Sequence, residues 1–286
     1  MNFKLLVLIY LLASNVAFSQ ATENISLPNK STHKSSSQKH IVKYAGPSIV
    51  KPPSKTTMEF FKAVDLGNPD IAELLLKQGA DINCGNCTDY GFTLLFVHTG
   101  LLNGKAPMDT VIWLINHGAD VNKQNKQGET PIMLATSFVT TVYADGNSAL
   151  NYFLKNGANP AIKNKEGLNT LHFLAKPVPV PVGAGGYYLD VTKEMNANYE
   201  IAVKNVVADG AKINETTNDG LTALHIASEK CNPDAIKLFL SLGADTSAKT
   251  NKGDTPFSLA LSMAASNHMK SCNDVVALLK VDGIQQ

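Results

Sequence analysis

The sequence predicts an all-α fold, a solenoid of about six helix-turn-helix repeats with β-hairpin-like fingers between them. Two recurring phrases predict this fold. The first contains Gly-Ala and a polar residue, ends an apolar helical stretch, and recurs at residues 79–83, 118–122, 157–160, 210–214 and 243–247. The second begins with a glycine about ten residues later and recurs at residues 91–94, 128–131, 167–172, 220–225 and 253–256.

Helix stop and start signals alternate along these phrases. The glycine of the first phrase suits a left-handed cap at the end of a helix. In the second phrase, a threonine hydroxyl can cap the first amides of the next helix, and Pro131 and Pro256 suit its first turn. The predicted capping residues are Thr93, Thr130, Thr170, Thr222 and Thr255.

The predicted repeats differ in length. The spacing between successive closing glycines is longest from Gly157 to Gly210 and shortest from Gly210 to Gly243, and the extra residues fall between the two helices of a repeat. Helices this short are not stable alone, so their stability must come from stacking. We expect residues 56–83 and 253–283 to cap the two ends of the stack with a more polar outer face.

The phrases resemble ankyrin repeats, whose signature they share over residues 56–284. The resemblance implies repeats at approximately residues 56–90, 91–127, 128–166, 167–219, 220–252 and 253–286. It implies that His172 and His225 hydrogen-bond to the backbone of a neighbouring repeat. It also implies that fingertips bind a protein partner, although ordinary turn chemistry explains their composition equally well. These fingertip candidates are Asp89, Tyr90, Lys123, Lys126, Lys163, Lys165, Lys249 and Lys252.

The N-terminal residues have the pattern of an export signal. Residues 1–19 contain a lysine, an apolar run and small residues before a cleavage site near Ser19, so they read as a secretory signal peptide. Residues 20–55 read as a disordered basic leader rich in Ser, Thr, Lys and Pro, and residues 56–286 as the repeat domain. We expect a periplasmic or secreted protein without a membrane anchor, because no later apolar run is long enough to span a bilayer.

Composition argues against a nucleic-acid partner. Residues 56–286 hold 18 lysines and 23 acidic residues, a net charge of −5, and the whole chain has no arginine. A nucleic-acid surface usually shows an excess of basic residues, with arginine for reading phosphate and guanine. No constellation of residues suggests a catalytic site, a metal site or a cofactor site, so we expect a non-enzyme.

The four cysteines permit two disulfides in an oxidising compartment. Cys231 and Cys272 occupy near-equivalent positions in adjacent repeats and are expected to pair, with two free thiols as the alternative. Cys84 and Cys87 have the spacing of a thiol oxidoreductase, but they lie in a predicted finger rather than at a helix N-terminus. A stapled loop is therefore expected there, and a redox or metal role is the alternative.

The longest insertion contains a further candidate binding site. Tyr187 and Tyr188 follow alternating prolines and clustered glycines, which exclude a helix or a buried strand at that point. Because tyrosine supplies a large contact area at low entropic cost, these two residues are candidate partner anchors. A loop folded back on the repeats is the alternative. Trp113 aligns with Leu74 and Leu238 and is expected to be a core residue.

Together, these observations predict a monomeric, non-catalytic protein-interaction module. The most specific hypothesis is a cognate inhibitor or immunity protein that neutralises a toxic exported enzyme. The alternatives are an envelope scaffold linked to oxidant defence, and a redox activity that involves Cys84 and Cys87.

Overall fold

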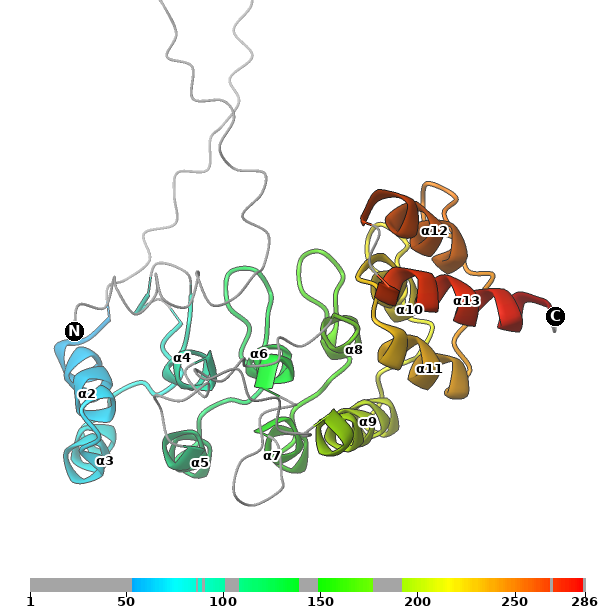
Figure 1. The fold of residues 1–286 in the computed structure, drawn as a ribbon. Helices are drawn as coiled ribbons and strands as arrows, with labels where there is room; N and C mark the ends of the chain where they lie inside the picture. Colours follow the sequence, from blue (N-terminus) through cyan, green and yellow to red (C-terminus); the bar gives the residue numbers. More distant parts are fainter. Residues whose placement is uncertain are drawn as a thin grey trace, which may run out of the picture. The chain divides into compact units, whose positions relative to one another are not determined.

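In a computed structural model, the described residues are 53–85, 87–88, 91–100, 108–138, 149–176, 192–267 and 270–284. All their regular secondary structure is helical, and within these ranges no strand is assigned (Figure 1). No helix in the described part of the chain is long and apolar enough to cross a membrane. The elements are α2 (Lys55–Asp65), α3 (Pro69–Lys77), α4 (Leu94–Gly100), α5 (Met108–Asn116), α6 (Pro131–Ala135), η1 (Thr136–Phe138), α7 (Ala149–Lys155), α8 (Thr170–Leu174), α9 (Thr192–Ala208), α10 (Ala223–Glu229), α11 (Pro233–Ser241), α12 (Pro256–Asn267) and α13 (Lys270–Ile284).

The described helices form six consecutive pairs, from α2 with α3 to α12 with α13. The first helices of successive pairs also pack side by side, from α4 through α6, α8 and α10 to α12. Among the second helices, α7 packs on α9 and α11 on α13. This is the repeat stacking that the alternating signals predict, and it gives each short helix neighbours on several sides.

Buried apolar residues recur at equivalent positions of successive helices in the shared core. The first helices contribute an aliphatic residue four positions after the glycine of the second phrase, as in Leu95, Ile132 and Leu171. The second helices contribute a residue four positions before the closing glycine, as in Phe153 and Phe239. All five side chains are buried, so the same register is repeated along the stack.

Helix capping follows the prediction at three of the five threonines. Thr93, Thr222 and Thr255 accept a hydrogen bond from the backbone N–H three residues later. Thr130 is the N-cap of α6 but makes no side-chain capping bond.

The assignment of Thr170 as a helix cap is wrong. Asn169 is the N-cap of α8, and its side chain accepts from His172 N–H at 3.2 Å. Asn169 stands two positions after Gly167, as Thr222 stands two positions after Gly220. The distance from the glycine therefore identifies the N-cap residue better than the residue type does, because an asparagine caps a helix as well as a threonine does.

The first repeat does not have the polar outer face that was expected. Leu66, Ile71 and Leu74 are 83%, 48% and 54% exposed, respectively. Leu66 is the C-cap residue of α2, and Ile71 and Leu74 lie on α3, so the first pair of helices exposes large apolar side chains. The last repeat does expose the polar Lys280 on α13.

The long insertions lie outside the described residues. Undescribed stretches at 101–107, 139–148 and 177–191 separate the two helices of the second, third and fourth pairs. After the longest stretch, α9 runs for 17 residues, compared with nine in α3, α5 and α11. The buried Tyr199 hydroxyl donates to the Leu174 carbonyl oxygen at 2.6 Å and fixes α9 to α8.

Candidate binding surface on the row of fingers

We use the term finger for the segment between a closing glycine and the next helix. In the second finger, Asn125 N–H donates to Glu129 O at 2.9 Å, and the Asn125 side-chain oxygen accepts from Gln127 N–H and Glu129 N–H. Equivalent backbone bonds close the next three fingers at Asn164, Thr217 and Thr250. The described parts of the fingers are therefore hydrogen-bonded turns, and no strand pairing of a β-hairpin is assigned in them.

Neighbouring fingers are bonded to each other near their tips. Lys165 N–H donates to Gln127 O, Asn218 N–H to Glu166 O, and Asn251 N–H to Asp219 O, at 2.9 to 3.0 Å. Gly167 shows how closely they approach, because a Cβ atom there would lie 2.6 Å from Asn218 N. Its φ of 81° also requires glycine. The tips of fingers two to five therefore form one connected row.

A second set of bonds joins the bases of the fingers. Asn83 donates from Nδ2 to Gly118 O at 3.1 Å and accepts at Oδ1 from Asp120 N–H at 2.7 Å. Asn122 bridges to the third finger and Asn214 to the fifth in the same way. Each asparagine thus satisfies two backbone groups of the next repeat, and we call this series the asparagine ladder.

The aspartates of the Gly-Ala-Asp phrase stabilise the same turns. Asp81, Asp120 and Asp245 each accept a hydrogen bond from the N–H two residues later, at 2.8 to 2.9 Å. Hydrogen bonding to Ser247 lowers the pKa of Asp245. These carboxylates have a structural role in positioning the ladder residues that follow them.

The ladder is interrupted between the third and fourth fingers. Ala161 stands where the first, second and fourth fingers have asparagine, and an ion pair connects this junction instead. Lys163 Nζ lies 2.5 Å from Glu215 Oε1 and donates to Thr216 O at 2.9 Å. The hydrogen bond from Lys163 holds the pKa of the Glu215 carboxyl below its usual value. Lys163 was proposed as a partner contact, but its position here shows that it also bridges two fingers.

We expect Asn122→Ala to lower the free energy of unfolding by about 1 kcal/mol, because it leaves Gly157 O and Asn159 N–H without their bridge. Asn156→Ala is the matched control, since the Asn156 side chain donates to Tyr152 O of α7 in the same repeat. Urea unfolding measures the cost. Amide exchange at Asn159 should accelerate in the Asn122 variant alone, and equal exchange in both variants would contradict the role of the ladder.

His172 and His225 hydrogen-bond to the backbone of fingers four and five. His172 Nε2 lies 3.1 Å from Glu215 O and 3.3 Å from Leu221 O, and His225 Nε2 lies 3.1 Å from Asp254 O. Carbonyl oxygens only accept, so each Nε2 carries a hydrogen. This bonding to the next repeat confirms the prediction for both residues. Burial lowers the pKa of His172 to about 4 and also lowers the pKa of His225.

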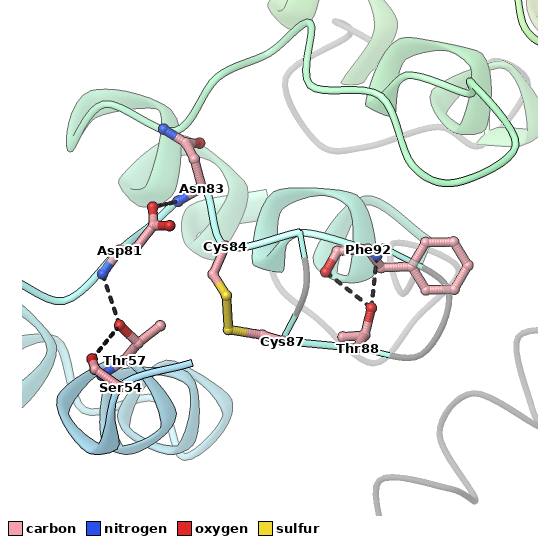
Figure 2. The surroundings of a disulfide bond; sticks show 8 residues. All are labelled: Ser54, Thr57, Asp81, Asn83, Cys84, Cys87, Thr88 and Phe92. Atoms are coloured by element: carbon pink, nitrogen blue, oxygen red, sulfur yellow. Dashed lines mark hydrogen bonds between the residues drawn. A yellow bond between two sulfur atoms is a disulfide. The ribbon is translucent and has the colours of Figure 1, made fainter. Parts of the chain in front are cut away.

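The first finger contains a disulfide between Cys84 and Cys87 (Figure 2). This finger is longer than the later ones, because its closing glycine and the glycine of its second phrase are further apart in the sequence. The extra residues fall in the segment that the cysteines span, so the bond closes the lengthened part of this finger. Below it, Thr57 of α2 accepts from Asp81 N–H at 3.0 Å and ties the finger to the first helix.

The structure places the predicted partner-binding residues unevenly. All six fingertip lysines are exposed and lie on the connected row: Lys123, Lys126, Lys163, Lys165, Lys249 and Lys252. Asp89, Tyr90, Tyr187 and Tyr188 lie outside the described residues. One side of the Trp113 ring packs on the core, as expected. The ring also stacks on the ring of the exposed His117, with the two centroids 3.9 Å apart, so Trp113 is only partly buried.

The residues that build this surface were not predicted. Asn83, Asn122 and Asn214 carry the ladder, and their signal in the sequence is an asparagine four positions after three of the closing glycines. Within the described ranges, no group of three or more His, Cys, Asp or Glu side chains is placed to hold a metal ion. What the arrangement does offer is a fixed row of backbone turns with exposed polar side chains.

A family model described as ankyrin repeats (three copies) matches residues 60–164 and 194–285, which is more than half of the chain. Among curated proteins, the chain is 28% identical over 154 residues to alpha-latrocrustotoxin-Lt1a of Latrodectus tredecimguttatus, covering 54% of this chain and 9% of that protein. It is 40% identical over 65 residues to protein phosphatase 1 regulatory subunit 27 of Mus musculus, covering 23% and 42%. The chain covers 9% to 13% of the first curated relatives that it matches.

Solved structures share the fold. An ankyrin repeat domain from Acinetobacter baumannii AYE has a TM-score of 0.55 at 22% identity, covering 79% of this chain and 97% of that one. A chain in the complex of a predatory endopeptidase from Bdellovibrio bacteriovorus with an immunity protein has a TM-score of 0.54 at 23% identity, covering 80% and 98%.

Proposed function

Because this chain belongs to the ankyrin-repeat family, whose members are generally non-catalytic interaction modules, we propose that it binds one protein partner through its row of fingers. We further propose that it does so in the periplasm, as a cognate inhibitor or immunity protein that neutralises a toxic exported enzyme. The pattern of residues 1–19 and the two cysteine pairs support export to an oxidising compartment.

The connected row of fingers is the observation that carries this proposal. Hydrogen bonds at the tips and bases hold the fingers in one arrangement, so little conformational entropy remains to be lost when a partner binds. Such preorganisation suits tight binding to a single surface. One solved chain of this fold comes from a complex of an endopeptidase with an immunity protein, and the same kind of pairing is proposed here.

The test is affinity capture with the tagged mature protein from its native envelope, followed by measured binding to the purified partner. The inhibitor hypothesis expects one partner with nanomolar affinity, whose enzymatic activity falls on binding. A partner that handles oxidants would instead favour the alternative scaffold role. A partner that binds without losing activity would contradict the inhibitor role.

We expect the combined substitution of Lys123, Lys126 and Lys165 by alanine to weaken partner binding about 10- to 100-fold, mainly by slowing association. The matched control replaces Lys155, Lys237 and Lys280, which are exposed on α7, α11 and α13 and remove the same charge. Association and dissociation rates measured by surface plasmon resonance separate the effects. Equal loss in both triple variants would show that net charge, and not the row of fingers, governs binding.

A further inference from the structure

The first pair of helices presents a stacking face, and no described helix precedes this pair in the chain. We call this face the N-terminal face, and its residues are Met58, Lys62, Leu66, Ile71 and Leu74. Four of the five are large apolar side chains that are more than a third exposed. Single exposed leucines need no explanation, but several apolar side chains on one face indicate an interaction site.

The repeat register shows what this face does elsewhere in the molecule. Ile71 stands eight positions before its closing glycine, and the residues at that position in three later repeats are Ala149, Ala202 and Ala235. These alanines are at most 1% exposed. The position is therefore buried inside the stack, where a small side chain fits, whereas in the first repeat it carries a large, exposed isoleucine.

Leu74 occupies a position that contacts the preceding repeat. It stands five positions before its closing glycine, as do Trp113 and Asn205. The Trp113 ring lies 6.4 Å from the Phe60 ring of the preceding pair. The Asn205 side chain donates to Asn151 of the preceding pair at 3.0 Å. Leu74 therefore points toward the place that one further repeat would take.

Lys62 determines the chemistry that a partner surface needs in order to cover the N-terminal face. It stands five positions before Gly67, as Ile226 stands five positions before Cys231, and both turn residues have positive φ. Ile226 is 5% exposed, whereas Lys62 is exposed. A partner that covers this face must therefore neutralise one ammonium group within an apolar surround. A second copy would bring its own Lys62 to the same face, which like-charge repulsion disfavours.

We propose that the N-terminal face binds an amphipathic helix of a partner protein, with apolar residues against Ile71 and Leu74 and one carboxylate against Lys62. This helix takes the place of one more repeat at the end of the stack. The site is separate from the row of fingers, and its existence does not depend on the function proposed for that row.

Anilinonaphthalene sulfonate, an apolar anion, tests the chemistry of the face on the purified full chain. We expect its fluorescence enhancement to fall severalfold in Lys62→Glu and in Leu74→Ser, but not in Leu261→Ser, which alters a 51% exposed leucine on α12. Circular dichroism and urea unfolding verify that the variants remain folded. Equal enhancement in all variants would overturn the proposal. A lower urea midpoint in both N-terminal variants would do so as well, since it would mean that the face is already covered within the same chain.

Photo-crosslinking then identifies the occupant. A benzophenone amino acid replaces Leu74 or, as the control, Leu261, and the protein is irradiated in its native envelope. The supporting result is a crosslinked peptide that forms an amphipathic helix, is lost with Lys62→Glu, and is restored when the partner's carboxylate is changed to lysine. A crosslink to a second copy of this chain, or no crosslink above the Leu261 control, would overturn the proposal.

Discussion

Replacing both Cys231 and Cys272 by alanine is expected to lower the free energy of unfolding by about 4 kcal/mol. The disulfide joins residues 41 positions apart in the sequence, with their Cα atoms 4.5 Å apart. It closes a loop that contains α11, the fifth finger and α12, and such a cross-link limits the unfolded chain in proportion to the logarithm of loop length. Urea unfolding under non-reducing conditions measures the loss.

The backbone at Cys231 provides a control for this prediction. Cys231 has a φ of 53° in the turn before α11, and the equivalent residue of the first repeat is Gly67, with a φ of 67°. Cys231→Gly combined with Cys272→Ala should therefore recover about 1 kcal/mol relative to the double alanine variant, because glycine adopts this conformation without strain. The remaining loss is the contribution of the cross-link itself.

Loop length also predicts the order of the two disulfides. Cys84 and Cys87 are three positions apart, so the same chain-entropy relation gives about 2 kcal/mol for their replacement by alanine. A smaller loss for the Cys231 and Cys272 pair than for this pair would contradict the loop-closure explanation. It would mean that packing around the sulfur atoms, rather than loop closure, sets the cost.

Much of the fold could be predicted because repetition makes each signal visible several times. A glycine at the end of a helix is ambiguous once, but five such glycines in register predict a stacked helical array. The same register placed Cys231 and Cys272 in adjacent repeats. The error at Thr170 arose where residue type and register disagreed, since Asn169 caps the helix one position earlier.

The surface was harder to predict because its bonds link different repeats. Lys163 reads as an exposed charge in the sequence, and only the structure pairs it with Glu215 of the following finger, beyond the longest insertion. The exposed apolar face of the first repeat was also missed. Whether an apolar position is buried depends on the neighbour that stacks on it, and the sequence of a single repeat does not show which of its faces a neighbour covers.

The second large effect is expected in acid, where His172 should cost the fold about 3 kcal/mol. The unfolded pKa is 6.5 and burial lowers the folded pKa to about 4, so between these values the unfolded chain binds more protons. Stability from this residue is therefore fully present above pH 6.5 and is lost as the pH falls toward 4. A protonated ring would lose Nδ1 as an acceptor for Asn169 N–H, which lies 3.2 Å away.

His172→Gln isolates this effect from the other titrating groups, because only the difference between the two proteins is compared. The wild type should be the more stable at pH 7, and its advantage should shrink by about 3 kcal/mol as the pH is lowered to 4. The midpoint of the His172 ring proton shift in NMR gives the folded pKa directly. A midpoint near 6.5, with a constant difference in stability, would contradict the prediction. It would mean that Asn169 Oδ1, 2.6 Å from Nδ1, accepts a hydrogen bond from the protonated ring and compensates for its burial.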